Sequence, residues 1–521
     1  MMISRASARE RSAMSPLVVA LTPVLGLYLC IQVIAFSKIG AFEFPLDDIY
    51  IHLAMAEQIA SGGYGVNAGE YTSAASSPLY PFLLVPFGGQ PAQIWVAVLW
   101  NLLALVGSVV LWVRIVGDAV EDRRWAAVLA ALGPLAFNLA GAAMVAMEHT
   151  LHVFASLAVL RGLQTQMREG RISWLLVFGM LIGPLIRFEG LAVSGAAASA
   201  LALVGRWKIG AGLFAISVAL VAAFMGFLMS LGLEPLPNSV MAKISGPTGS
   251  PDFALANLFG KLQVQLQRSV PAMAMLVTLV IALVSLVRSD KADSMGRAIL
   301  VAALFAGSGQ LFLGQFGWFE RYELYAMSFV FGLMMLYAFR PEVERTVRVL
   351  VVVGLGFLTI YYGHWMLRYG VWAPGGIYAQ QQNASRFVKD VYQKPIAVND
   401  LGYVAWGNPN YVLDLWGLAS YRALKIRMDE PYEGWAGDLT DEAGIDLAIV
   451  YDSWFEDGLG KDWVKVGTLR FTNAIAFLGG RDVSYYATNA EAAPELRQMI
   501  ADFAPTVTGP AEMWVEEGTV K

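Results

Sequence analysis

The first two thirds of the chain alternate between long apolar segments and short polar ones. A helix of about 20 apolar residues spans the roughly 30 Å hydrocarbon core of a bilayer, so each long segment is a candidate transmembrane helix. The segments between 149 and 205 are shorter than a full span. One pair of them could therefore be a broken or re-entrant helix pair rather than two full spans. We expect about eleven transmembrane helices, at residues 16–36, 92–113, 125–146, 149–163, 173–186, 190–205, 210–232, 270–287, 298–315, 324–339 and 349–366.

From about Ala373 the pattern changes to short β-type runs that alternate with helical segments. We therefore predict a transmembrane domain at 1–372, with long outer loops at about 38–91 and 233–269, and an α/β domain at 373–521. The expected fold class is an α-helical polytopic membrane protein with a small C-terminal α/β extracytoplasmic domain. The β-type runs lie at 395–398, 411–415 and 447–451, and the helical segments at 380–391 and 495–503.

The distribution of Lys and Arg predicts the orientation, since short loops rich in these residues stay in the cytoplasm. With the N-terminus inside, most of them fall in short inner loops, and the apolar segment after Arg5, Arg9 and Arg11 is an uncleaved first helix. We expect a multi-pass protein of the bacterial inner (cytoplasmic) membrane, with a cytoplasmic N-terminus and a periplasmic or extracellular C-terminal domain. The predicted outer loops hold only Lys38, Arg187, Lys243, Lys261, Arg268 and Arg321.

Composition agrees with a membrane protein, because 57% of the residues are apolar and only 15% are charged. The net charge of −5 and the lack of a basic cluster argue against a nucleic-acid partner. The one cysteine, Cys30, lies in the first apolar segment, so an intramolecular disulfide is excluded.

The first outer loop contains two adjacent carboxylates, Asp47 and Asp48, soon after Pro45. This order is typical of a helix N-terminus, where one carboxylate caps the helix. One cap needs only one acceptor, so the second carboxylate is left for another role. If the helix begins here, Asp48 and His52 lie four residues apart on one face, and a base and a phosphate ligand would share a pocket.

Further ionisable residues recur where predicted helices reach the outer surface. Placing an ionisable side chain within the bilayer costs a few kcal/mol of free energy unless it is ion-paired or in contact with water. The set of such residues therefore predicts a shared polar cavity. For each residue alone, a structural ion pair or interfacial snorkelling is the alternative. The residues are Glu148, His149, Arg187, Glu189, Lys243, Glu320 and Arg321.

Several motifs follow one another between residues 44 and 420. In this order they resemble the GT-C superfamily of membrane glycosyltransferases, and within it the branch of the mycobacterial terminal β-(1→2)-arabinofuranosyltransferase. Two positions differ from that pattern: Phe188 stands in place of Pro and His149 in place of a small residue. The motifs are Leu-Asp-Asp-Ile-Tyr at 46–50, Gly-Val-Asn-Ala-Gly-Glu at 65–70, Ser-Ser-Pro-Leu-Tyr at 76–80, Met-Glu-His at 147–149, Arg-Phe-Glu-Gly at 187–190, Pro-Asn-Ser at 237–239 with Lys243, Arg-Tyr at 321–322, and the stretches 398–402 and 412–418.

The resemblance implies a GT-C enzyme that moves a monosaccharide from a polyprenyl phosphate to a cell-envelope glycan or lipid acceptor, with inversion. Such a reaction needs a base for the acceptor hydroxyl and cations for the departing phosphate. Asp47 or Asp48 would be the base, with Asp47 preferred. The implied phosphate ligands are Lys243, Arg187, Arg321 and His52, and the implied metal or acceptor ligands are Glu148, His149 and Glu189.

The resemblance leaves open a divalent cation (Mg, Mn or Ca) between Asp48 and Glu148, and implies no other cofactor. Two other functions also fit the topology: a transporter or flippase of lipid-linked glycans, and a non-catalytic envelope-assembly protein. A transporter would place its ionisable residues mid-helix near a pseudo-symmetry axis, and an assembly protein would not need the aspartate pair. Four tryptophans of the last domain are expected either to stack on sugars or to fill its core: Trp406, Trp416, Trp435 and Trp454.

Overall fold

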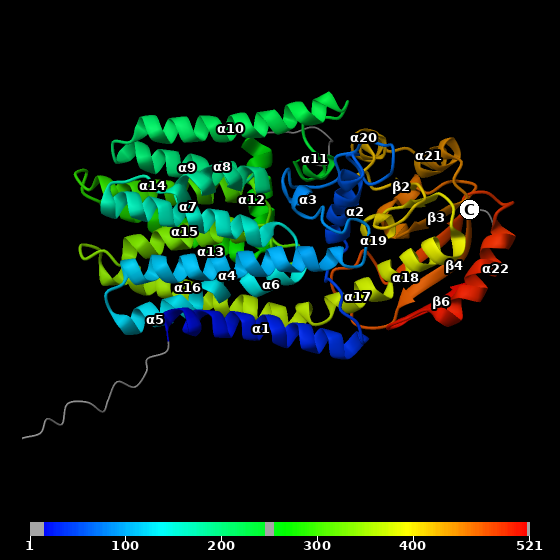
Figure 1. The fold of residues 1–521 in the computed structure, drawn as a ribbon, viewed down its shortest axis with the longest axis horizontal. Coiled ribbons are helices and arrows are strands. Elements are labelled where there is room, and N and C mark those ends of the chain that lie inside the picture. The colour runs from blue at the N-terminus through cyan, green and yellow to red at the C-terminus, as the bar shows by residue number, and fades with distance from the viewer. Residues whose placement is uncertain (1–14, 245–254, 518–521) are drawn as a thin grey trace, which may run out of the picture.

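The computed structural model describes residues 15–244 and 255–517, and it consists of a long helical bundle with a mixed α/β unit at one end (Figure 1). The bundle helices run side by side along the long axis of the molecule. Ten of the eleven predicted apolar segments coincide with one bundle helix each, and the segment at 125–146 covers two successive helices. The bundle consists of α1 Pro16–Ile39, α4 Gln93–Ala119, α5 Arg123–Ala136, α6 Leu139–Val145, α7 His149–Glu169, α8 Trp174–Ile186, α9 Gly190–Leu203, α10 Trp207–Ser230, α13 Val270–Arg288, α14 Ser294–Leu313, α15 Leu324–Ala338 and α16 Arg345–Trp365.

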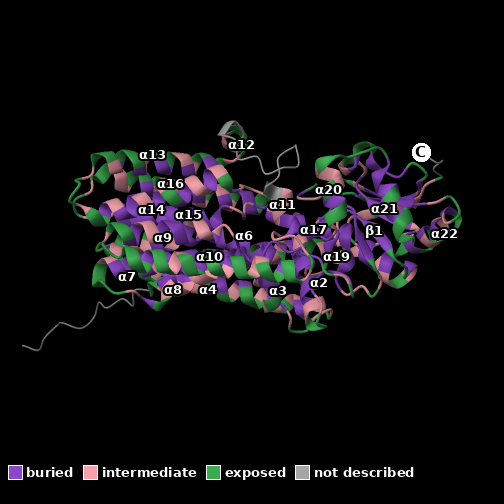
Figure 2. Cartoon of the chain, turned by 90° about the horizontal axis from the view of Figure 1, so that it is seen from above, coloured by how far each residue is buried: buried purple, intermediate pink, exposed green. Residues whose placement is uncertain are grey.

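In the described part of the chain, seven helical stretches are long and apolar enough to cross a membrane, and α8, α9 and α15 are shorter apolar helices. The outward faces of α10 and α13 expose large apolar side chains along their length, whereas α15 is buried throughout (Figure 2). The outward face of α1 also exposes large apolar side chains. An apolar exterior around a buried central helix is what a bilayer-embedded bundle requires. The polytopic helical class is confirmed, while the number of helices that cross the membrane stays a prediction.

Short helices occupy the end of the bundle that faces the α/β unit. The first outer loop forms α2, Asp48–Ala60, and the four-residue α3, Tyr80–Leu83; the second forms α11, Asn238–Ile244, and α12, Leu255–Arg268. The helix predicted after Pro45 is therefore present and begins at Asp48. Asp47 occupies its N-cap position, but its side chain makes no capping hydrogen bond to α2.

The C-terminal unit is built on a six-stranded sheet of order β2-β1-β3-β5-β4-β6. The first three neighbours, β2, β1 and β3, are parallel, and the remaining pairs are antiparallel. The three predicted β-type runs form these parallel strands. The strands are β1 Ile396–Val398, β2 Val412–Asp414, β3 Leu447–Val450, β4 Val464–Phe471, β5 Asp482–Ala487 and β6 Ala511–Val515; the helices are α17 Ala373–Ala379, α18 Gln381–Arg386, α19 Gly402–Ala405, α20 Tyr421–Asp429, α21 Trp435–Ala443 and α22 Ala493–Phe503.

The α/β unit is hydrogen-bonded to the first outer loop over a wide area. The side chain of Asn67 exchanges two hydrogen bonds with the backbone of Val412 in β2, at 2.9 and 3.0 Å. The carboxylate of Glu57 in α2 accepts a hydrogen bond of 2.8 Å from the backbone N–H of Gly407. Because backbone groups of one unit pair with side chains of the other, this contact has a defined geometry. Through these contacts the C-terminal unit packs on the first outer loop.

Candidate active site

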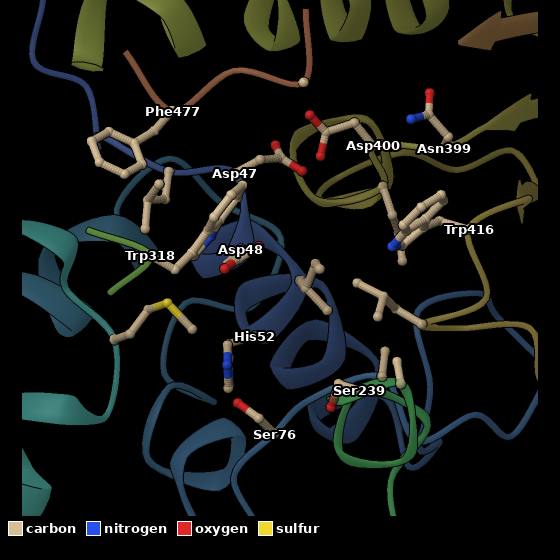
Figure 3. A pocket seen from close by; sticks show the side chains of 18 of the residues that line it. Asp47, Asp48, His52, Ser76, Ser239, Trp318, Asn399, Asp400, Trp416 and Phe477 are labelled. Carbon is tan, nitrogen blue, oxygen red and sulfur yellow. The ribbon is translucent and has the colours of Figure 1, made fainter. Parts of the chain in front are cut away.

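A cavity of about 480 Å³ lies where the two parts meet. The parallel strands β1, β2 and β3 have their carboxyl ends at the same edge of the sheet, and residues that follow these ends line the cavity. This edge is the usual place for ligands in parallel sheets. Figure 3 shows residues from this edge and from α2 and α11 around the same space. The bundle end contributes Asp47, Asp48, His52, Ser76, Met147, Ser239, Trp318, Arg321 and Tyr322, and the α/β unit contributes Asn399, Asp400, Trp416, Leu418, Arg427, Trp454 and Phe477.

Asp48 lies at the start of α2 with its carboxylate in the cavity. Its side chain is 34% exposed, and it accepts a hydrogen bond from Nη2 of Arg321, whose own side chain is only 1% exposed. The Nε atom of Arg321 is buried and has no hydrogen-bond partner among the described residues. A buried guanidinium with an unused donor is suited to bind an anionic oxygen of a substrate.

The loop before Arg321 has an unusual backbone conformation. Trp318, Phe319 and Glu320 have φ values of 45°, 66° and 49°, in the left-handed region that non-glycine residues rarely adopt. Three such residues in succession persist only where the surrounding contacts hold them, and such conformations cluster at functional sites. The loop therefore presents Arg321 in a fixed position.

Asp47 points in a different direction from Asp48. Its side chain accepts hydrogen bonds from the backbone N–H groups of Gly402 (2.6 Å) and Tyr403 (2.8 Å), at the start of α19. Asp47 is only 6% exposed. It is therefore an anchor between the bundle end and the α/β unit, and its carboxylate satisfies the free N–H groups of a helix in the other unit.

A second carboxyl group, that of Asp400, lies against Asp47 (Figure 3). Burial, with the neighbouring charge of Asp400, raises the pKa of Asp47 well above its usual range. Burial also raises the pKa of Asp400 to about 6, although a hydrogen bond of 2.6 Å from Nε2 of Gln381 opposes the shift. Two buried carboxyl groups in contact favour a shared proton, because two adjacent charges would repel.

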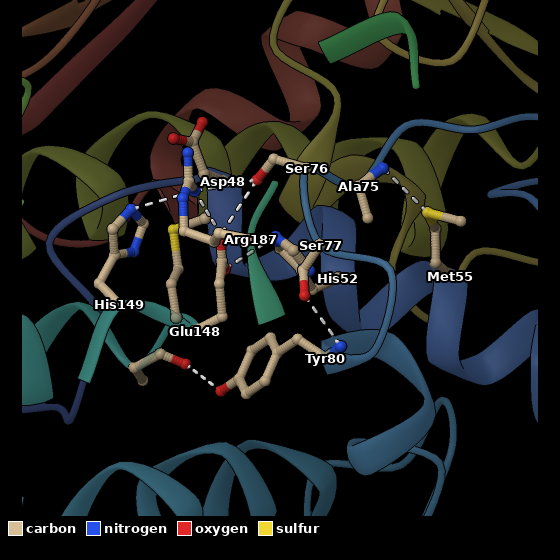
Figure 4. Close-up of polar contacts among 12 residues, drawn as sticks. Asp48, His52, Met55, Ala75, Ser76, Ser77, Tyr80, Glu148, His149 and Arg187 are labelled. Atoms are coloured by element: carbon tan, nitrogen blue, oxygen red, sulfur yellow. Dashed lines mark hydrogen bonds and ion pairs between the residues drawn. The ribbon is translucent and has the colours of Figure 1, made fainter. Parts of the chain in front are cut away.

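The predicted ligands around Arg187 form a buried ion-pair cluster beside the cavity (Figure 4). Arg187 donates to Glu148 at 2.6 Å and to Glu189 at 2.7 Å, and its Nη1 lies 3.3 Å from Nε2 of His149. Nε2 of His52 is 3.5 Å from the other oxygen of Glu148. Two carboxylates thus balance the charge of Arg187, so its role as a phosphate ligand stays a prediction that this geometry does not favour.

Among the remaining predicted residues, Arg321 and His52 line the cavity with the aspartates. Lys243 belongs to α11, whose Ser239 and Ala242 also line it, but the Lys243 side chain lies outside the described part of the structure. Its role as a phosphate ligand therefore stays a prediction.

A metal ion between Asp48 and Glu148 does not fit the arrangement well. Asp48 pairs with Arg321, whereas Glu148 pairs with Arg187, so each carboxylate already has its own cation. The described residues contain no group of three or more His, Cys, Asp or Glu side chains placed to hold a metal ion. No step of the reaction proposed below depends on a metal.

The four tryptophans of the α/β unit that were expected to stack on sugars or to fill its core fall into two groups. Trp406 is buried against Tyr50, and Trp435 lies in a separate apolar cluster of the unit. Trp416 and Trp454 are partly exposed at the cavity, with ring centroids 4.5 Å apart. Only the second pair is placed to contact a ligand.

Sequence reasoning missed Arg427 and Asn399 as site residues. Asn399 directly follows β1. A polar residue directly after a predicted parallel strand indicates a ligand site at that edge of the sheet, and this signal could have identified Asn399. Arg427 lies on α20, in a segment without a motif, so only the folding of α20 onto the β2 loop brings it to the cavity.

A second, largely apolar cavity of about 840 Å³ lies between α9 and α14. Glu189 and Tyr325 contribute polar groups to its lining. Arg187 connects the two cavities, since it binds Glu189 and also lies 3.5 Å from the Ser76 hydroxyl, which lines the first cavity.

Residues 375–486 match a family model described as a domain of unknown function, DUF8728. No curated protein matches the chain. Two solved structures share some likeness with it, both of ArnT from Cupriavidus metallidurans. The apo form has 14% identity and a TM-score of 0.43, and covers 91% of this chain and 98% of its own. The form bound to undecaprenyl phosphate has 17% identity and a TM-score of 0.40, with coverages of 91% and 99%.

The segment that matches DUF8728 contains every residue that the α/β unit contributes to the cavity from Asn399 to Phe477. The matched unit is therefore part of the site rather than a separate appendage.

Proposed function

We propose that the protein is a glycosyltransferase of GT-C type that transfers a monosaccharide from a polyprenyl phosphate to a cell-envelope acceptor. The observation that supports this most directly is the Asp48–Arg321 pair in a cavity between the end of an apolar bundle and a sheet edge. Displacement of a phosphate by a sugar hydroxyl requires a base for the hydroxyl proton and a cation for the departing phosphate, and this cavity contains one group of each kind.

In the proposed reaction Asp48 accepts the proton of the acceptor hydroxyl. The hydroxyl oxygen bonds to the anomeric carbon, while the bond from that carbon to the phosphate oxygen breaks on the opposite face and the configuration inverts. Arg321 binds the departing phosphate, to which its unpartnered Nε can donate. We assign the base to Asp48 rather than Asp47, because two backbone N–H groups already occupy the Asp47 carboxylate.

The lipid part of the donor needs an apolar path from the bilayer. The 840 Å³ cavity between α9 and α14 offers such a surface next to the polar site. It supports a long-chain lipid donor over a soluble nucleotide sugar, whose charged carrier would gain nothing from apolar lining.

The proposed location is the outer face of the bacterial inner membrane, with the N-terminus in the cytoplasm. The end of the bundle away from the α/β unit holds a concentration of arginines, which is expected of the cytoplasmic side. The described residues there include Arg123, Arg124, Arg168, Arg171, Arg206, Arg340, Arg345 and Arg348.

The direct test is sugar transfer by the purified full-length protein in lipid nanodiscs. Decaprenyl and undecaprenyl phosphates that carry arabinose or a hexose would be offered with extracted envelope glycans and lipids as acceptors. We expect one donor to be consumed and its sugar to appear on the acceptor. The arabinose donor tests the resemblance to the arabinofuranosyltransferase branch. Movement of intact lipid-linked sugar across liposomes, without transfer, would instead identify a flippase.

A further inference from the structure

The loop after β2 holds Trp416 in a fixed position at the cavity. The buried carboxylate of Asp414 accepts hydrogen bonds from the backbone N–H groups of Trp416 (2.8 Å) and Ala419 (2.6 Å). Gly417 has φ of 96°, and a Cβ there would lie 2.4 Å from the backbone nitrogen of Leu424 in α20. The loop is thus closed tightly against α20, and a larger residue at 417 would not fit.

Arg427 of α20 lies on the Trp416 ring. Its Nε donates to the Trp416 carbonyl oxygen at 2.9 Å, and its guanidinium carbon is 3.8 Å from the ring centroid. The charge of the Asp414 carboxylate acts on Arg427 without forming an ion pair with it, and Arg427 makes no other hydrogen bond to the described residues. The remaining N–H groups of a stacked, partly buried arginine are therefore available to an anion in the cavity.

Asn399, at the end of β1, provides a second donor at the same sheet edge. It is only 4% exposed, and its Oδ1 accepts a hydrogen bond of 3.0 Å from the backbone N–H of Tyr451. Its Nδ2 is buried without a partner among the described residues, and the residue lines the cavity. A buried amide donor is costly unless a ligand accepts its hydrogen bond.

We propose that this edge of the α/β unit is the acceptor subsite, and that it selects a glycan bearing an anionic group, a carboxylate or a phosphate. Arg427 binds the anion, Asn399 donates to a sugar oxygen, and Trp416 with Trp454 contacts the sugar face. The subsite belongs to the acceptor, because the lipid of the donor holds its phosphate at the bundle end, near Arg321. The inference that the bound sugar is an acceptor rests on the proposed function.

The experiment measures binding of small probes to the full-length protein in nanodiscs by saturation-transfer NMR and titration. The probes are methyl glucuronide, glucose 6-phosphate and the uncharged methyl glucoside. We expect wild type to bind at least one anionic probe about tenfold more tightly than the glucoside, as charge-assisted hydrogen bonds predict. Arg427→Gln should abolish this preference, and Arg427→Lys should retain part of it.

The matched control is Arg422→Gln, because Arg422 lies on the same helix but is exposed and paired with Glu442; it should keep the preference. Absence of any preference in wild type, or its persistence in Arg427→Gln, would overturn the proposal. A loss of undecaprenyl phosphate binding in Arg427→Gln, with sugar binding unchanged, would place Arg427 in the donor site and also overturn it. Since these measurements need no catalysis, failure of transfer and failure of the subsite are separable.

Discussion

At the scale of single residues, two adjacent aspartates of one loop have different surroundings. Asp48 is partly exposed beside Arg321, whereas Asp47 is buried against the N–H groups of α19. Neighbours along the chain at the start of a helix point about 100° apart, so one can face the cavity while the other faces the adjoining unit. These surroundings support Asp48 as the proposed base and Asp47 as an anchor between the two units.

Replacement of each aspartate by asparagine separates these roles. Asp48→Asn should lower turnover of the folded protein by about 10² or more, the usual effect of losing a general base. It should also lower the melting temperature, because the buried Arg321 loses its counter-charge. Asp47→Asn should lower stability by about 1–3 kcal/mol, because an amide accepts only one of the two backbone hydrogen bonds. Transfer rates and thermal unfolding of both variants test this. Loss of turnover in Asp47→Asn, with turnover retained in Asp48→Asn, would assign the base to Asp47 instead.

The pKa of about 6 for Asp400 makes a prediction about pH. The ordinary value is 3.8, so between pH 4 and 6 the folded state binds more protons at this group than the unfolded state. The contribution of Asp400 to the free energy of unfolding is therefore greatest below about pH 4, falls as pH rises to about 6, and is then constant. Melting curves of wild type and Asp400→Asn across this range should converge toward low pH, and a difference independent of pH would refute the assignment.

At the scale of elements, the contact between α2 and α19 depends on one glycine. A Cβ at Gly402 would lie 2.3 Å from the carbonyl oxygen of Asp47 and 2.6 Å from its Oδ2. Since real Cβ contacts do not reach such distances, any side chain at 402 must separate the two helices. The backbone of the α/β unit at Gly402 is thus in close contact with the loop that carries Asp47 and Asp48.

Gly402→Ala is therefore expected to destabilise the protein by about 1–3 kcal/mol, as overpacking usually does, and to lower turnover because Asp48 is next to the displaced anchor. Gly212→Ala in α10 is the control, since no heavy atom lies within 4 Å of its added Cβ. It should be neutral or slightly stabilising in a helix. Thermal unfolding and susceptibility to proteolysis report the difference, and equal stability of the two variants would contradict the tight contact.

At the scale of the whole molecule, the bundle and the α/β unit place the site at one end of the membrane part. The apolar exterior and the arginines at the opposite end predict which side faces the cytoplasm. With this predicted orientation, the polar cavity would face the outer side, where the proposed acceptor would reach it.

Cysteine labelling tests this orientation in a Cys30→Ser background. Glu491→Cys in the α/β unit should react with a membrane-impermeant maleimide on intact cells, whereas Glu169→Cys, at the end of α7, should react only after the inner membrane is opened. Both positions are exposed, so access to the reagent depends on the membrane alone. Labelling of the two sites in the reverse order would place the cavity in the cytoplasm and remove the basis for an outer-face enzyme.

The apolar segments, the strand runs after Ala373 and the aspartate pair were predictable from sequence, because hydrophobic length, alternation and helix-start chemistry are local properties. The roles within the site were not. Arg187 pairs with Glu148, 39 residues away in the chain, and Asp47 binds backbone 355 residues away. Arg427 reaches the cavity only when α20 packs on the β2 loop. Sequence by itself thus determined the bundle, the three parallel strands and the loop of the site, but not the antiparallel strands β4, β5 and β6. The tertiary structure decided which charges are neutralised and which face the cavity, since electrostatic partners are neighbours in space rather than along the chain.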